Sequence, residues 1–270
     1  MEEILPIIAA YRKLNLQGII DYDKFNDFAI VHHSTAIEGS TLTENETRLL
    51  LDEGLTPKGK PLEHSLMVKD HYAALLFVLT AAKQPKPISA GFIQQINAIV
   101  MKSTGALYNT ALGQVDASKG EFRKGNVSAG GSYFINYDKV AAYTNQLAAS
   151  INHMLKAAST ELEKIELSFA AHFDLVSIHP FYDGNGRTSR LLMNYIQALC
   201  QLPLAIVFKE DKNEYFTALQ QSRKLSTIQP FITFMYGQYQ QYLTNEITLY
   251  HQSLQRGNPP NKTNGFSIFF

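Results

Sequence analysis

The residues best suited to chemistry stand together in one stretch of twelve, HPFYDGNGRTSR, at 179–190. Its core, Gly184 to Gly186, falls where one apolar helical pattern ends and the next begins. Glycines there let backbone N–H groups turn into one concavity, and the positive end of the second helix adds to it, which makes a generic phosphate site. Arg187 and Arg190 share a face in the first turn of that helix, where cations oppose the helix dipole. The pattern therefore predicts an anion that compensates them.

Two further side chains in this stretch, His179 and Asp183, flank the same concavity. The pKa of an imidazole lies near neutral pH, so His179 could accept the proton of an attacking hydroxyl. A single carboxylate beside phosphates is a usual way to hold Mg²⁺, because this ion keeps most of its water and binds phosphate oxygens. Together these residues predict phosphoryl or nucleotidyl transfer, chemistry that depends mostly on positioning and charge.

Each of these residues also has a simpler interpretation. His179 could cap the C-terminal end of a helix, where cations are favoured. Asp183 followed by Asn185 resembles a fragment of a calcium loop, but the other ligands are missing and Arg187 stands where a carboxylate would fall. A Gly-Asn-Gly triplet alone is a turn. Only the combination of a base, a carboxylate, a glycine turn and two arginines in one stretch predicts a transfer site.

Two helices are expected to position this stretch. Thr160 and Glu163 form a capping box in front of the first helix, and Pro180 ends it. The second helix begins near Gly186 and continues until Pro203. The apolar stripes that define the two helices are Leu162, Ile165, Phe169, Phe173 and Val176, and then Leu191, Leu192, Tyr195 and Leu199.

Most of the remaining sequence also predicts helix. Thr43 and Glu46 form another capping box, and Gly54 a C-terminal cap, for a helix over about 44–53. Segment 120–136, GEFRKGNVSAGGSYFIN, has glycine turns and alternating apolar residues, which predicts a short hairpin. The tail at 256–264 is loop-like. The fold class is therefore all-α, mainly helical, with one short β-hairpin.

Composition limits the classes of function. The chain has 270 residues, of which 45% are hydrophobic and 18% charged, as in ordinary globular domains. Lys plus Arg and Asp plus Glu both number 24, so no overall field attracts nucleic acid or an anionic membrane. The single cysteine, Cys200, cannot form a disulfide framework. The apolar stretch 73–82 is too short to span a bilayer, and the N-terminus does not resemble a secretory signal, so we expect a cytoplasmic protein.

The stretch at 179–190 resembles the signature of Fic-domain proteins, HPFx(D/E)GNGRxxR, at every fixed position. The resemblance extends over roughly residues 90–235. It implies three regions: an N-terminal helical region at 1–89, a Fic core at 90–235, and a C-terminal helix and tail at 236–270. Fic proteins generally transfer AMP from ATP to a Ser, Thr or Tyr hydroxyl of a target protein.

The resemblance also implies a role for each matching position. His179 would be the general base, and Asp183 would hold Mg²⁺ against the phosphates of ATP. The anion hole would be formed by Gly184, Asn185 and Gly186, with Arg187 near the β-phosphate and Arg190 near the γ-phosphate. The hairpin resembles the family's flap, which pairs with the target segment through the backbone of Val127, Ser128, Ala129 and Gly130. Tyr215 and Phe216 fall where the family places contacts to the nucleobase, although packing of a helix face explains them equally well.

A second match lies near the N-terminus. Residues 34–39, STAIEG, resemble the inhibitory motif (S/T)xxxE(G/N) of Fic proteins, with Ser34, Glu38 and Gly39 at the defined positions. A carboxylate at the end of a helix is repelled by the helix dipole and needs a cation. Pairing Glu38 with Arg190 would satisfy both and occupy the space of the γ-phosphate. The alternative is a solvated Glu38 beside a cap glycine.

The leading hypothesis is a protein adenylyltransferase inhibited by Glu38. Two alternatives stay open: a de-AMPylase that uses Glu38 to activate water, and a nucleotide-binding regulatory module without turnover. The expected partner is a target protein that presents a hydroxyl to the flap, with the protein itself as a second candidate target. We expect no nucleic-acid or membrane partner, and a homo-oligomer is left open.

Overall fold

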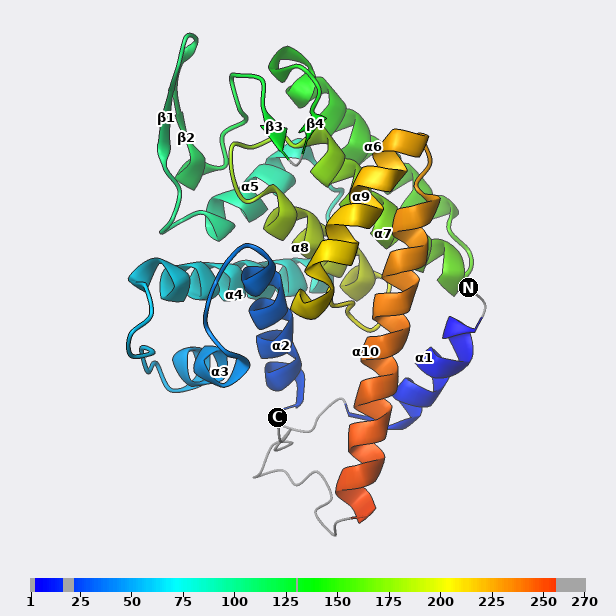
Figure 1. The fold of residues 1–270 in the computed structure, drawn as a ribbon. Coiled ribbons are helices and arrows are strands. Elements are labelled where there is room, and N and C mark those ends of the chain that lie inside the picture. Colours follow the sequence, from blue (N-terminus) through cyan, green and yellow to red (C-terminus); the bar gives the residue numbers. More distant parts are fainter. Residues whose placement is uncertain (1–2, 17–21, 130, 256–270) are drawn as a thin grey trace.

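Helices build the body of the protein, and two short hairpins lie beside one another at one end of it (Figure 1). The computed structural model describes residues 3–16, 22–129 and 131–255. The helices are α1 (Ile4–Lys13), α2 (Tyr22–Ile37), α3 (Glu44–Asp52), α4 (Leu62–Lys83), α5 (Ala90–Val100), α6 (Val140–Ala157), α7 (Glu161–Ile178), α8 (Asn185–Leu199), α9 (Lys212–Leu225) and α10 (Gln229–Gln255). The strands are β1 (Leu107–Thr110), β2 (Gly113–Asp116), β3 (Ser128–Ala129) and β4 (Ser132–Tyr133), which form two antiparallel pairs. The expected mainly helical class is confirmed.

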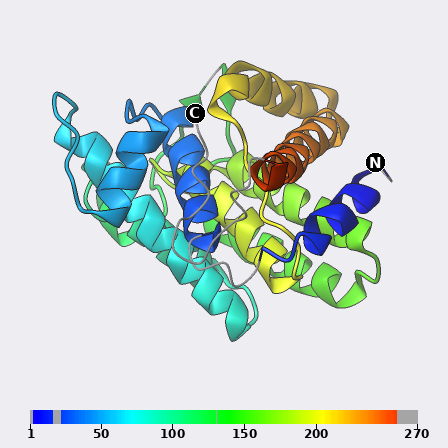
Figure 2. The ribbon, with the colours of Figure 1, turned by 90° about the horizontal axis from the view of Figure 1, so that it is seen from below.

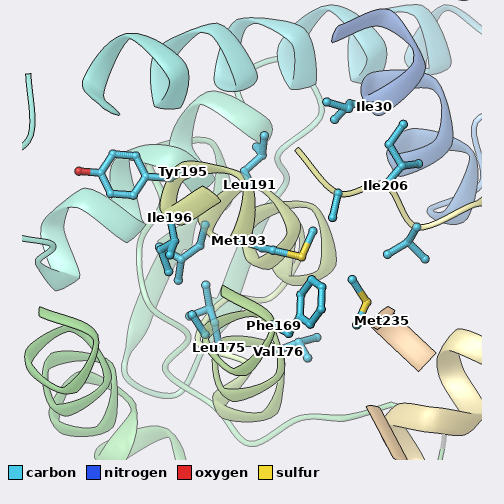
Figure 3. Packing of buried hydrophobic residues seen from close by; sticks show 14 of the residues in the cluster. Ile30, Phe169, Leu175, Val176, Leu191, Met193, Tyr195, Ile196, Ile206 and Met235 are labelled. Carbon is cyan, nitrogen blue, oxygen red and sulfur yellow. The ribbon is translucent and has the colours of Figure 1, made fainter. Parts of the chain in front are cut away.

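The central pair is α7 and α8, which pack directly against each other. The capping box of Thr160 and Glu163 starts α7 as predicted, and α8 begins at Asn185, one residue before the expected position. Leu175 of α7 and Ile196 of α8 meet in the core (Figure 3). Because α8 also packs against α4 and α5, its polar first turn is held inside the protein.

The helix α4 is longer than the apolar stretch at 73–82 suggested. It has 22 residues, and by length and composition alone it could cross a membrane. Core helices pass the same test, and α4 packs against α2, α5 and α8. Figure 2 shows α4 beside α2, with α1 beside α10 on the other side of the molecule. We therefore interpret α4 as a core helix.

The helix α2, which carries most of the motif at 34–39, ends in a hydrogen-bonded cap. Gly39 adopts a positive φ of 106°, and the N–H groups of Gly39 and Ser40 donate to Ala36 and Thr35. This is the Schellman arrangement, in which Glu38 is the C-cap residue. The neighbouring helix α3 begins with the predicted capping box of Thr43 and Glu46.

Two features differ from the sequence prediction. The hairpin β1–β2 was not expected, because its strands are only four residues long and its alternation is weak. The predicted boundary between 235 and 236 falls inside α10, so it marks no break in the chain. The boundary between 89 and 90 coincides with the start of α5, and the three-part division stays a prediction. The tail at 256–264 lies outside the described residues.

We call residues 120–136 the flap. Its strands pair Ser128 with Tyr133 and Ala129 with Ser132, which confirms a hairpin shorter than the whole segment. The flap starts at Gly120, which has a φ of 63° and lies against α5. A Cβ atom there would come within 2.1 Å of the carbonyl oxygen of Gln94. Only glycine allows the flap to leave the body at this point.

Replacing Gly120 by alanine should therefore destabilise the protein more than its backbone conformation alone explains. Gly131 has a similar φ of 75° with nothing within 4 Å, so Gly131→Ala is a matched control. We expect the control to lose about 1 kcal/mol of unfolding free energy from backbone strain. Gly120→Ala should lose at least about 2 kcal/mol more, because the backbone of α5 cannot yield easily. Urea denaturation measures both, and equal losses would show that the contact with α5 is unimportant.

Candidate active site

The first turn of α8 forms an open anion cradle. Gly184, the N-cap residue, has a φ of 77° and provides no side-chain cap. A Cβ atom there would come within 2.8 Å of the side chains of Asn97 and Met101, so the turn requires glycine. The first backbone N–H groups of a helix have no acceptor within the helix and carry its positive partial charge. The Gly184–Gly186 turn therefore has the expected capacity to bind an anion.

The side chain of Asn185 serves the loop rather than the cradle. Its Oδ1 accepts the N–H of Phe181 at 3.0 Å, and its Nδ2 donates to the Phe181 carbonyl at 2.9 Å. Phe181 is buried and packs against Phe122, so it anchors the loop in the core. Asn185 can therefore contribute its backbone N–H, and not its side chain, to the predicted anion hole.

Both arginines of the stretch are buried beside this turn. Arg187 is only 2% exposed and Arg190 only 3%. One nitrogen of Arg187 lies 3.4 Å from Asp183 and 3.1 Å from the sulfur of Met101. Within the described part of the chain, its Nε and Nη1 have no hydrogen-bond partner. Buried donors without partners are costly, so Arg187 is suited to an anionic ligand that the protein itself does not supply.

Arg190 is bonded to the N-terminal motif as the sequence predicted. Its Nη2 donates to Glu38 Oε1 at 2.7 Å and to the Ser34 carbonyl at 3.0 Å, while its Nε donates to Ser34 Oγ at 2.8 Å. The Glu38 carboxylate also covers the cradle, because a Cβ atom on Gly186 would lie 2.4 Å from Glu38 Oε1. The carboxylate therefore sits where a phosphate would approach the helix end.

Charge keeps Glu38 ionised in this position. Burial favours the neutral acid, but Arg190 and Arg187 outweigh it and lower the pKa of Glu38 below its ordinary value. The side chain retains 27% exposure, so part of the group still meets solvent. A carboxyl with a lowered pKa stabilises the fold above its unfolded pKa, and this contribution disappears as the pH falls through the lowered value. The ion pair is therefore present at neutral pH and is lost only in acid.

His179 stands at the end of α7, in the loop that leads to α8. The residue has a φ of 52° and caps α7, so the simpler capping interpretation also applies to its backbone. Its Nδ1 faces the Val176 carbonyl at 3.4 Å. That carbonyl can only accept, so Nδ1 carries the hydrogen and Nε2 keeps its lone pair. Burial lowers the pKa of His179 to about 4, which leaves the imidazole neutral near pH 7.

Asp183 stands at the open side of the loop, with its side chain 51% exposed. Its carboxylate accepts the N–H of Gly184, and its carbonyl accepts from Asn97 Nδ2 at 3.1 Å. Asn97 also donates to Thr188 Oγ1 at 3.1 Å and so ties α5 to the loop and to α8. Nothing in the sequence pattern of α5 distinguished this buried asparagine from an ordinary core residue.

Sequence analysis also missed Arg123, the residue that joins the flap to the active-site loop. Its buried guanidinium donates to the carbonyl of His179 at 2.8 Å and to that of Gly125 at 2.8 Å, and also to the carbonyl of Ile135. The N–H of Arg123 donates to Pro180 O at 3.0 Å. An arginine in the segment FRKGN resembled a solvated turn residue, and only the fold shows that it is enclosed.

The residues predicted to contact the target segment and the nucleobase differ in their positions. Val127, Ser128 and Ala129 lie in or beside β3, whereas Gly130 lies outside the described residues. Tyr215 is a correction: it is 1% exposed, and its hydroxyl lies 2.8 Å from Nε2 of His172, so it is a core residue behind Arg190 rather than a base contact. His172 is itself fully buried and is a core residue as well. Phe216, by contrast, is 41% exposed, with the ammonium group of Lys212 over its ring.

Within the described ranges, no group of three or more His, Cys, Asp or Glu side chains could hold a metal ion alone. A Mg²⁺ ion bound by Asp183 would need its other ligands from water and phosphate, as this ion commonly has. The unpartnered nitrogens of Arg187 beside an uncapped helix end likewise fit a polyphosphate. The residues present therefore fit both ATP and Mg²⁺.

Comparison with known proteins agrees with this geometry. Residues 87–197 match the model of the Fic/DOC family. Protein adenylyltransferase Fic from Drosophila yakuba is 33% identical over 209 residues, which are 77% of this chain and 39% of that protein. The chain thus spans about two fifths of the length of this relative.

Solved structures show the same fold. A Fic domain containing signaling protein from Bacteroides thetaiotaomicron has a TM-score of 0.77 and 25% identity, over 91% of this chain and 96% of that one. Fic-1 from C. elegans has a TM-score of 0.74 and 24% identity, over 92% of this chain and 72% of that one.

The Arg123 contacts give a prediction about the flap. Arg123→Lys keeps the charge, but its single ammonium nitrogen cannot reach the three carbonyls that bond to three different guanidinium nitrogens. Amide hydrogen exchange of residues 124–136 should therefore accelerate by at least about tenfold. Lys124→Met, which removes only an exposed bond to the Gln114 carbonyl, is the control and should leave exchange unchanged. Equal protection in all three proteins would mean that the strands alone hold the flap.

Proposed function

Because the chain belongs to the Fic/DOC family, we propose that it is a protein adenylyltransferase that transfers AMP from ATP to a Ser, Thr or Tyr hydroxyl of a target protein. The observation that carries the proposal is the uncapped start of α8 with the buried Arg187 beside it. Among the described residues, Nε and Nη1 of Arg187 have no hydrogen-bond partner, and His179 precedes the same turn. A relative that is 33% identical is a protein adenylyltransferase, which supports a protein as the acceptor.

The residues of the site have separate roles in the proposed reaction. The N–H groups of the Gly184–Gly186 turn and Arg187 would bind the α- and β-phosphates, and Arg190 would bind the γ-phosphate. Nε2 of His179 accepts the proton of the target hydroxyl as its oxygen attacks the α-phosphorus. The bond from the α-phosphorus to the bridging oxygen breaks, and pyrophosphate leaves with its charge held by the arginines. A Mg²⁺ ion, held by Asp183, would add charge neutralisation at the phosphates.

We propose that Glu38 is a built-in inhibitor of this reaction. Its carboxylate occupies Arg190 and lies over the backbone of Gly186, so it competes with the outermost phosphate for the same donors. ATP could still bind with its other phosphates, but its α-phosphate would be displaced from the line of attack. A misplacement of about 1 Å can cost roughly a hundredfold in rate.

The same carboxylate supports a second candidate function. Glu38 is ionised and close enough to His179 to affect its pKa, so it could orient a water molecule for removal of AMP from a modified protein. In that case the protein without mutations should release AMP from an adenylylated target, and the Glu38→Gly variant should not. Transfer increased by Glu38→Gly, without such release, favours the first candidate.

The proposed inhibition by Glu38 can be tested by measuring transfer activity. In Glu38→Gly, labelling of target or self from α-labelled ATP should rise by roughly a hundredfold, because Arg190 becomes free for the γ-phosphate. Adding His179→Ala should abolish labelling, while adding His153→Ala, which removes an exposed histidine of α6, should not. A folded Glu38→Gly protein that stays inactive would refute the inhibitory role, and ATP binding without transfer would indicate a regulatory module.

The proposed Mg²⁺ site at Asp183 can be tested separately. Labelling by the Glu38→Gly protein should disappear with EDTA and return with Mg²⁺. Asp183→Asn should need at least about tenfold more Mg²⁺ for half-maximal labelling, because a neutral amide holds the ion less strongly. Asp138→Asn, in the turn that follows the flap, is the control. Transfer that is insensitive to EDTA would contradict the proposed metal site.

A further inference from the structure

Three planar groups are layered at the end of α7. The ring of Phe134, from the flap, stacks on the imidazole of His179, with ring centres 4.0 Å apart and planes inclined by only 16°. The guanidinium of Arg223, from α9, also packs against Phe134, with its central carbon 5.3 Å from the ring centre. Phe134 therefore contacts His179 and a cation from a different helix.

Arg223 is itself fixed to the last turn of α7. Its Nε donates to Ser177 Oγ at 3.3 Å, and its Nη2 lies 3.5 Å from the Val176 carbonyl. The same carbonyl faces Nδ1 of His179. The imidazole and the guanidinium thus share one acceptor, and each contacts Phe134. The layer connects α7, α9 and the flap at the one residue whose orientation matters most for proton transfer.

We propose that Phe134 and Arg223 are positioning residues that hold the imidazole of His179 with Nε2 aimed at the reacting hydroxyl. The inference rests on the proposed transfer reaction, to which it adds two residues outside the signature stretch. Phe134 restricts rotation of the imidazole by covering its face. Arg223 holds Phe134 in place and adds a positive charge near the base.

The charges near His179 come from three segments. Arg123 of the flap and Arg223 of α9 lower the pKa of the imidazole in addition to burial, while Glu38 after α2 and the bond to Val176 raise it. Removing Arg223 removes a cation that disfavours the imidazolium, so the pKa of His179 should rise toward its ordinary value. A lysine at this position keeps the charge but lacks the planar guanidinium that packs against Phe134.

The first test follows the nitrogen NMR signals of His179, assigned with His179→Ala, and needs no transfer activity. In the protein without mutations, His179 should show one tautomer, with the hydrogen on Nδ1. Phe134→Leu should show a mixture, and Phe134→Tyr should restore the single tautomer. Arg223→Met should raise the pKa of His179, and Arg223→Lys should not. Arg48→Met on α3 removes a charge elsewhere and should change neither signal.

The second test measures transfer in the Glu38→Gly background. Phe134→Leu and Arg223→Met should each lower kcat by about tenfold or more, and Phe134→Tyr should restore most of the rate. KM for ATP should change by less than about twofold, because neither side chain lies in the phosphate cradle. Arg223→Lys should lower kcat without altering the acid limb of the pH profile.

The inference is overturned if Phe134→Leu keeps the single tautomer, or if both substitutions leave kcat unchanged. A fall in kcat with unchanged His179 signals would also overturn it, since the flap would then act on the target and not on the base. Absence of transfer in every variant refutes the proposed reaction, and the NMR signals then decide separately whether Phe134 and Arg223 hold the imidazole.

Discussion

Two buried guanidinium groups at the positive end of a helix are the constraint on which the site depends. Arg187 and Arg190 stand in the first turn of α8, where the helix dipole already carries positive charge, and both are almost fully enclosed. Such an arrangement is stable only with an anion nearby. The protein supplies the Glu38 carboxylate to Arg190 and the Asp183 carboxylate to one nitrogen of Arg187. Among the described residues, the other two nitrogens of Arg187 have no partner. The site is therefore half neutralised by the chain and half prepared for a ligand.

The surrounding helices hold this charged turn in place. Asn97 of α5 bonds to the loop and to Thr188, and Asn185 bonds to both backbone groups of Phe181. Arg123 bonds to the backbone of His179. The bonds of Asn97 and Arg123 join segments far apart in the sequence, whereas those of Asn185 close the loop locally. Because the loop is fixed by side chains from the body, its N–H groups are oriented before any ligand arrives, which is the preorganisation that transfer chemistry requires.

The sequence predicted local features well and enclosed contacts poorly. The capping boxes at Thr43 and Thr160, the helix ends near Pro180 and Gly186, and the pairing of Glu38 with Arg190 were all predictable, because each depends on residue types a few positions apart or on two complete motifs. Arg123, Asn97 and the stacking of Phe134 on His179 were not. An arginine in a glycine-rich turn and an asparagine in a helix have the same local pattern whether exposed or enclosed, and burial is decided by distant segments. For Tyr215 the sequence left both nucleobase contact and helix packing open, and its burial decides for packing.

Two separate sets of contacts hold Arg190 against the end of α2, one to Ser34 and one to Glu38. The hydroxyl and carbonyl of Ser34 lie within the last turns of the helix, whereas Glu38 is the C-cap residue, outside the regular hydrogen-bonding pattern. Withdrawal of the carboxylate therefore requires only a side-chain rotation at the helix end, and the two bonds from Ser34 can persist. The guanidinium would then keep its aim while one donor becomes vacant. The end of α2 therefore orients Arg190 as well as neutralising it, and losing the whole helix would not be equivalent to losing one carboxylate.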